Sequence, residues 1–386
     1  MPYDKSDKRS QRAFQALRLA VLAALLALST ALGLMHQFQR GTRPVGVDAL
    51  CPFGAIEAVY TLITTGAAIE RVAWSSYILL LATVLAALLF RRVFCGKICA
   101  FGTLQELFAR LGMGIFGRRL VVPEAVDKPA RYLKYAALAG AVAGSAIAGQ
   151  LFIRPYDPWA TYQHLFSREL LTGFQVGLLV LAVSLVGSLF FDRFFCKYLC
   201  PMGAFLALIR RIGWFRVRRN AGTCIHCSAC TKACPVNIPV ETLEQVHSAE
   251  CINCNLCVNV CPVKDTLYVG GPRKGFLPSA AVLGITAAVF TAVLAVGTAA
   301  GEIRWTVKPL TERVMEMPAF NPDEIKGIDS FKAVSDLTGI PEGEFIRTFK
   351  ISEEDFEKPI RESAHRDGSG FDVEAVREFV RERLGK

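Results

Sequence analysis

The sequence is poor in charge and lacks the motifs that mark most soluble enzymes. Only 20% of its 386 residues are Asp, Glu, Lys or Arg, whereas 52% are hydrophobic. It contains no Walker loop, no dinucleotide-binding fingerprint and no Ser, His and Asp arrangement typical of hydrolases. These absences argue against a nucleotide-dependent or hydrolytic soluble enzyme, and the hydropathy indicates a membrane protein.

Cysteine is abundant, but its pattern does not fit a disulfide scaffold. The thirteen cysteines are odd in number, and eight of them fall in two tight runs. Such runs need reduced thiolates to bind metal, so we expect them in a reducing compartment.

Five apolar stretches are close to the length of about 20 residues that crosses a bilayer. A basic segment precedes the first of them, and no A-x-A site follows it cleanly, so we expect a retained signal anchor. Counts of Lys and Arg in the loops predict a cytoplasmic N-terminus and a C-terminus outside. The five stretches are 13–34, 74–90, 132–152, 174–191 and 278–301.

The net charge of +10 is divided unevenly along the chain. Residues 302–386 carry 14 basic and 19 acidic residues, whereas the rest of the chain carries 30 basic and 15 acidic residues. A nucleic-acid partner is the usual explanation of a basic protein. Here the basic residues gather in the loops on one side of the predicted spans, so we expect no nucleic-acid partner.

The strongest motif is C-x2-C-x2-C-x3-C-P, which occurs twice between Cys224 and Pro262. Three closely spaced thiolates bind three irons of one cubane, and the fourth cysteine binds the other cluster. Zinc also uses C-x2-C spacing, but it does not require three successive cysteine steps and a C-P pair, twice over. The sequence therefore predicts two [4Fe-4S] clusters, one held by Cys224, Cys227, Cys230 and Cys261, the other by Cys251, Cys254, Cys257 and Cys234.

A second pattern, C-x3-C, follows two of the predicted spans. Cys95 and Cys99 end the second span, and Cys196 and Cys200 end the fourth, 101 residues later. The equal offset predicts two pseudo-repeated halves. Pro201 suits the first position of a helix, which would place Cys200 at a helix N-terminus that favours a thiolate. The four cysteines could form one third site, for a [4Fe-4S] cluster or zinc, or they could be ordinary buried thiols.

A further fragment, Cys51-Pro52-Phe53-Gly54, resembles these motifs but comes from an outer loop and lacks the partner cysteine four residues earlier. Cys51 is therefore a weaker candidate for a metal ligand. Polar residues of the outer loops could line a quinol-binding pocket in which imidazoles and carboxylates accept protons. Solvated loop residues are the alternative. The residues concerned are His36, Asp48, Cys51, Asp157 and His164.

Two C-x3-C segments at span ends, followed by a paired-cluster domain, resemble the NapH/NosR-type membrane polyferredoxins. The resemblance covers residues 13–301. Cys196–Pro201 matches the family signature C-x3-C-P fully, whereas Ala100 stands where the first copy would have Pro. The resemblance implies electron transfer between the quinone pool and a partner oxidoreductase.

We expect a membrane α-helical bundle with an inserted α+β ferredoxin-like domain and a small helical tail. The protein would be a multi-pass electron-transfer subunit of the cytoplasmic membrane, in contact with the bilayer, the quinone pool and a partner redox protein. The ferredoxin-like domain would be cytoplasmic and the tail outside. A maturation factor for a respiratory metalloenzyme and a redox sensor are alternatives. The expected domains are a four-span core (13–215), the ferredoxin-like domain (216–270), a fifth span (278–301) and a tail (302–386) with helices at 327–339 and 371–384.

Overall fold

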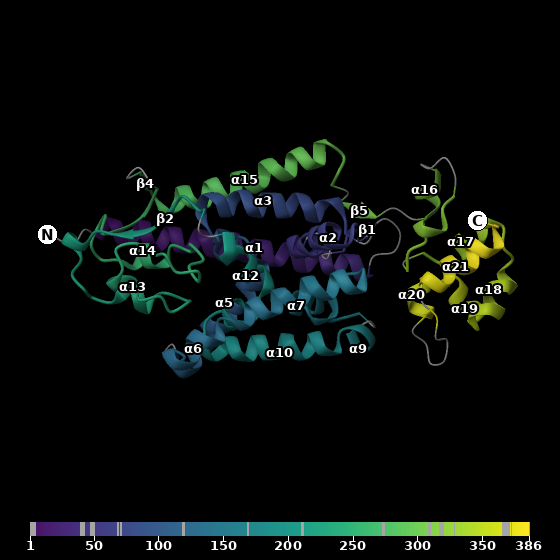
Figure 1. Cartoon of the computed structure of the whole chain (residues 1–386), viewed down its shortest axis with the longest axis horizontal. Coiled ribbons are helices and arrows are strands. Elements are labelled where there is room, and N and C mark those ends of the chain that lie inside the picture. Colours follow the sequence, from purple (N-terminus) through teal and green to yellow (C-terminus); the bar gives the residue numbers. More distant parts are fainter. Residues whose placement is uncertain are drawn as a thin grey trace. The chain divides into compact units, whose positions relative to one another are not determined.

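The structure of the chain, a computed structural model, falls into two compact units (Figure 1). The first comprises Met1–Leu34, Gly46–Leu165 and Phe174–Arg304, and the second comprises Met35–Val45, Phe166–Gly173 and Trp305–Lys386. The structure describes residues 5–38, 43–46, 51–67, 69, 72–117, 120–167, 170–209, 212–271, 275–303, 305–307, 310–315, 320–327, 329–364, 371 and 373–385.

Five long helices occupy the positions of the five predicted spans. They are α1 (Lys5–Phe38), α3 (Trp74–Phe90), α7 (Leu133–Ala148), α10 (Gln175–Phe190) and α15 (Ser279–Ala299). Two segments, Gln11–Phe38 and Ser279–Ala299, are long and apolar enough to cross a bilayer. Helices α3 and α10 are apolar but have 17 and 16 residues. Length and composition therefore identify two candidate spans among the described residues.

The stretches between these helices, which we expected to be loops, contain further helices. They are α2 (Pro52–Thr65), α4 (Val93–Lys97), α5 (Ala100–Phe116), α6 (Glu124–Ala130), η2 (Arg154–Tyr156), α8 (Pro158–Gln163), α11 (Phe194–Tyr198) and α12 (Pro201–Ile209). Helix α5 packs closely along α10, since Gly112 brings its backbone against the main-chain oxygen of Leu189, where any Cβ would overlap. Helices α4 and α11 contain the first cysteine of each C-x3-C segment, and α5 and α12 begin directly after the second.

A three-stranded antiparallel sheet and short helices follow α12 in the first unit. The elements are β2 (Arg216–Arg219), η3 (Ala221–Thr223), α13 (Ala229–Lys232), η4 (Val240–Thr242), α14 (Leu256–Val260), β3 (Leu267–Gly270) and β4 (Phe276–Leu277). The strand order is β2-β3-β4, and Val217 faces Val269 across the first pair. Both valines are buried. The segment is thus the α+β domain that carries the two cysteine runs.

The second unit consists of a two-stranded sheet and a group of short helices. Its elements are β1 (Arg43–Pro44), α9 (Leu170–Gly173), β5 (Thr306–Val307), α16 (Leu310–Met315), η5 (Pro322–Glu324), α17 (Phe331–Thr338), α18 (Glu342–Phe349), α19 (Glu353–Phe356), α20 (Ile360–Ser363) and α21 (Val373–Arg383). Phenylalanines from several of these helices make a core, in which Phe331 and Phe345 are fully buried. Helices α17 and α21 lie where the sequence predicted helices, but α18–α20 were not foreseen.

Candidate redox centres

One set of cysteines lines a cavity near the surface of the α+β domain. Cys224, Cys227, Cys230 and Cys261 all border it. Cys230 lies in α13 and Cys261 ends α14, so two short helices bring residues of the two runs together. Cys227 is exposed, whereas Cys230 is buried. These four residues are the set that the sequence assigned to the first cluster.

A second cavity lies deeper and is bordered by Cys234, Cys251, Cys254 and Cys257. Valine and isoleucine side chains complete its wall. Burial, followed by the charge of Cys254, raises the pKa of the Cys234 thiol to about 12. The Sγ of Cys234 accepts a hydrogen bond from the main-chain N–H of Ile238, which opposes that rise (3.4 Å). These are the four residues that the sequence assigned to the second cluster.

Left-handed residues shape both cysteine runs in the same way. His226 (φ 53°) and Ser228 (φ 58°) flank Cys227, and Asn253 (φ 48°) and Asn255 (φ 62°) flank Cys254. Residues other than glycine seldom adopt this conformation, and asparagine tolerates it best of these types. The alternation folds each run around a common centre, so that successive cysteines face one cavity.

The donor chemistry of both cavities fits an iron–sulfur cluster. Each offers four thiols from the spacing that cubane clusters use, in a largely apolar wall. Among the described residues, no three or more Cys, His, Asp or Glu side chains form a cage for a single metal ion.

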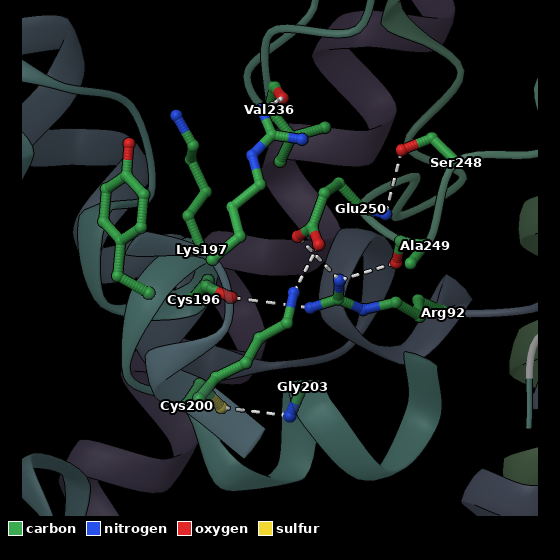
Figure 2. A network of polar contacts seen from close by, with 12 residues as sticks. Arg92, Cys196, Lys197, Cys200, Gly203, Val236, Ser248, Ala249 and Glu250 are labelled. Carbon is green, nitrogen blue, oxygen red and sulfur yellow. Dashed lines mark hydrogen bonds and ion pairs between the residues drawn. The ribbon is translucent and has the colours of Figure 1, made fainter. Parts of the chain in front are cut away.

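The C-x3-C cysteines form a third group. Cys99 caps α5, and its Sγ accepts a hydrogen bond from the N–H of Gly102 (3.4 Å). Cys200 precedes α12 and accepts one from Gly203 (3.3 Å), as Figure 2 shows. Helix α5 therefore begins at the equivalent position although Ala100 replaces the proline. Each pair thus ends in a thiol at a helix N-terminus.

The two pairs lie close to one another. Burial, followed by the charges of Cys196 and Cys95, raises the pKa of Cys99. The same causes raise the pKa of Cys200 well above its usual value, and Cys99 adds to them. The structure therefore brings together four thiols from residues 101 positions apart, within electrostatic reach of one another. Like the two cavities of the α+β domain, this group of four thiols has the donor chemistry for an anionic metal–sulfur group.

Two buried arginines connect the C-x3-C segments crosswise. Arg92, before the first pair, donates to the main-chain oxygen of Cys196 (3.5 Å; Figure 2). Arg193, before the second pair, donates to the main-chain oxygen of Cys95. Their exposed fractions are 1% and 0%. Gly102 leaves room for the guanidinium of Arg193, and Gly203 leaves room for that of Arg92, because a Cβ at either glycine would overlap the arginine.

Two carboxylates, the buried Glu250 and the partly buried Glu106, complete this basic environment. Glu250 pairs with Arg92 (3.2 Å) and Lys134, and Glu106 pairs with Arg18 (2.8 Å) and Arg193 (2.9 Å). Burial opposes ionisation of Glu250, but the charges of Arg92 and Lys134 outweigh it, so the pKa of Glu250 is lowered. Several basic residues that we counted as loop charges are thus interior groups around the cysteines. Counting them as loop charges had led us to expect exposed side chains.

The outer residues lie in separate elements and have separate partners. Cys51 and Asp157 occupy the N-cap positions of α2 and α8, each followed by a proline. His164 stacks on Phe174 with ring centroids 4.6 Å apart. His36 belongs to the second unit, where its Nδ1 lies 2.7 Å from the oxygen of Pro44. Asp48 lies outside the described residues.

A buried carboxyl group near these residues was missed from the sequence. Glu57 of α2 has no exposed surface; its Oε1 accepts hydrogen bonds from Ser145 (2.6 Å) and the N–H of Ile153 (3.1 Å). It interacts electrostatically with Asp157. The sequence does contain a sign of this group, because Glu57 stands in an otherwise apolar segment six residues after Cys51. A charged residue buried near a membrane often marks a functional site.

Comparison with known proteins agrees with this geometry. A family model described as a 4Fe-4S binding domain matches residues 72–121 and again 174–221, and one described as a 4Fe-4S dicluster domain matches 216–272. YccM of Escherichia coli, whose name assigns it to electron transport, is 34% identical over 54% of this chain and 59% of its own. An uncharacterized protein of Methanocaldococcus jannaschii is 31% identical over 51% of this chain and 77% of its own. The chain belongs to the NapH/NosR-type 4Fe-4S proteins.

Within this family, the ferredoxin-type protein NapH of Escherichia coli is 30% identical over 40% of this chain and 50% of its own length. The chain therefore spans about half to three fifths of NapH and YccM. No solved structure matches it. Membership places the chain in a ferredoxin-type 4Fe-4S family of electron transport proteins.

Proposed function

We propose that this protein carries electrons between the quinone pool and a partner redox protein through three tetracysteine centres. The observation that carries the proposal is the division of twelve cysteines into three groups of four. When bound, [4Fe-4S] clusters supply one-electron carriers whose potentials depend on charge, hydrogen bonds and exposure. Cys224, Cys227, Cys230 and Cys261 would hold one cluster, and Cys234, Cys251, Cys254 and Cys257 another.

The third centre would be held by Cys95, Cys99, Cys196 and Cys200. The crossed arginines support it, because two fully buried guanidinium groups offset the negative charge that four thiolates bring. The same family model matches each half of the core once, which supports two pseudo-repeated halves. Zinc is the alternative occupant of this centre.

The order of the centres follows from one close contact. Gly96 lies against the α+β domain: a Cβ there would overlap the main-chain oxygen of Ile252 and lie 3.2 Å from the nitrogen of Cys254. The C-x3-C centre is therefore next to the cluster of Cys254. Cys227, exposed in the other cavity, is the ligand that a soluble partner would approach. Electrons would pass along this series, in the direction set by the potentials.

The membrane part of the proposal rests on the five long helices. Gln11–Phe38 of α1 and the whole of α15 satisfy the length and hydropathy of a span, and α3 and α10 are shorter apolar helices. We propose that all five cross the cytoplasmic membrane, with the α+β domain on the cytoplasmic side and the tail outside. Quinol would approach the core from the side of Cys51, Glu57 and Asp157, where a buried carboxyl group could take up a proton.

The experiment is a potentiometric EPR titration of anaerobically purified protein, with spin, iron and sulfide quantitation. We expect three cluster signals, of which one disappears in Cys196→Ser and in Cys200→Ser. Two signals that both variants retain would refute the third cluster and favour zinc or thiol chemistry, as in an assembly factor. Reduction of the clusters by a short-chain quinol, in protein reconstituted into vesicles, tests the quinone link separately.

A further inference from the structure

Each of the two C-x3-C segments contains one lysine, and the two lysines differ in their partners. Lys97 follows Cys95 by two residues, whereas Lys197 follows Cys196 by one, so the two lysines hold neighbouring positions of the repeat and not equivalent ones. Both are buried, with exposed fractions of 0% and 1%. Each ammonium lies over an aromatic ring, Lys97 over Phe14 (5.0 Å) and Lys197 over Tyr198 (4.9 Å).

Only Lys197 has a carboxylate beside it. Its Nζ lies 3.1 Å from Oδ1 of Asp127. The Nζ of Lys97 has no hydrogen-bond partner in the part of the chain that the structure describes. Arg18 is already paired with Glu106, and its charge repels Lys97. An ammonium buried without a partner costs several kcal/mol, so its charge needs compensation from elsewhere.

The acidic group that acts on Lys97 is the thiol of Cys254. The charge of Cys254 favours the charged form of Lys97, whereas the charge of Arg18 opposes it. The contact of Gly96 with Cys254 explains the proximity, because it places the backbone of the C-x3-C segment directly on the cysteine run. A cluster held by four thiolates is anionic and becomes more so on reduction.

We infer that Lys97 is the counter-charge of the cluster held by Cys234, Cys251, Cys254 and Cys257, and that it raises the reduction potential of that cluster. This inference rests on the proposed function, since it requires a cluster in the second cavity. A cation close to a cluster stabilises the reduced, more negative form over the oxidised form. Low local dielectric strengthens the effect, because both groups are buried. The cluster would then accept electrons from the C-x3-C centre more readily.

The test compares reduction potentials in the full-length, cluster-loaded protein. The EPR signal of this cluster is first identified as the one lost in Cys254→Ser. Lys97→Met keeps the length of the side chain and removes the charge, and Lys97→Arg keeps the charge. Lys197→Met is the matched control, because the charge that it removes is already balanced by Asp127. We expect a more negative midpoint in Lys97→Met, and a midpoint near that of the unmodified protein in Lys97→Arg and Lys197→Met.

Each other outcome also decides the inference. An unchanged midpoint in Lys97→Met, or an equal shift in Lys197→Met, overturns it. If Lys97→Met and Lys97→Gln lose this cluster while Lys97→Arg retains it, the charge is required and the inference stands. Loss in all three variants overturns it, because size would then be the decisive property. Absence of the cluster from the unmodified protein refutes the proposed function itself, which spin and iron counts show before any variant is compared.

Discussion

Arg92 donates a hydrogen bond of 3.5 Å to the main-chain oxygen of Cys196, which lies 104 residues later, in the second C-x3-C segment. Arg193 makes the converse contact with Cys95 of the first. Each segment thus depends on the other half of the core for a buried partner. These two crosswise hydrogen bonds hold the two cysteine pairs at a fixed separation.

Replacing Arg193 should weaken this core. Arg193→Met removes a fully buried partner of Glu106 and should lower the free energy of unfolding by about 3 kcal/mol. Arg110→Met is the control, because Arg110 also pairs with Glu106 but its side chain is 44% exposed. We expect it to change the stability by less than about 1 kcal/mol. Thermal unfolding in detergent measures both, and equal losses would contradict the crosswise role of Arg193.

The fourth cysteine of each run should belong to the other run's cluster. Cys261→Ser is expected to remove the EPR signal that Cys227→Ser removes, and Cys234→Ser the signal that Cys254→Ser removes. Cys51→Ser serves as the control and should leave both signals in place. The assignment is wrong if Cys261→Ser and Cys254→Ser remove the same signal.

The Asp127 network should make stability dependent on pH in the acid range. Burial opposes ionisation of Asp127, but hydrogen bonds from Tyr198 and Arg131 and the charge of Lys197 outweigh it and lower the pKa of Asp127. Its stabilising contribution is therefore present above the unfolded-state pKa of about 3.9 and is lost as the pH falls through the lower folded-state value.

Asp127→Asn should accordingly destabilise the protein at pH 7, and the difference from the unmodified protein should shrink below about pH 4. Chemical unfolding followed by circular dichroism at several pH values measures it. Glu124→Gln is the control on the same helix, since the Glu124–Lys128 pair is exposed and its loss should have little effect. A difference for Asp127→Asn that stays constant at acid pH would refute this role of the carboxylate.

Gly96 should tolerate no side chain. Gly96→Ala would force the C-x3-C segment away from Ile252 and Cys254, with an expected loss of about 1–3 kcal/mol and a lower iron content. Gly140→Ala in α7 provides the comparison, because a Cβ at Gly140 would meet nothing within 4 Å. Thermal unfolding and iron analysis together test the contact, which would be disproved by equal behaviour of the two variants.

The phenylalanine core should hold the second unit together. Phe345→Ala removes a fully buried ring that packs on Phe331 and Phe379, and we expect a loss of about 3–5 kcal/mol. Limited proteolysis of the full chain should then cleave the tail at lower protease concentrations. Met315→Ala, whose side chain is 85% exposed, should leave the cleavage pattern unchanged. Identical patterns for the two variants would show that this core does not stabilise the tail.

The sequence by itself determined the local features. The spacing C-x2-C-x2-C-x3-C-P divides eight cysteines into the same two sets that line the two cavities, because chain connectivity limits which thiols can share a centre. The apolar stretches gave the positions of the long helices, because a buried or lipid-facing helix needs a continuous apolar sequence. Pro201 marked the start of α12, since proline suits the first turn of a helix.

Only the tertiary structure decided which charges have partners. Lys97 and Lys197 occur in similar motifs, and nothing in their local sequence indicates that one lies beside a carboxylate and the other beside a thiol. The contacts of Arg92, Arg193 and Glu57 likewise join residues 87 to 158 positions apart, which no local pattern reports. Such contacts arise because packing brings distant segments into a low-dielectric interior, where each charge must find a partner or remain costly.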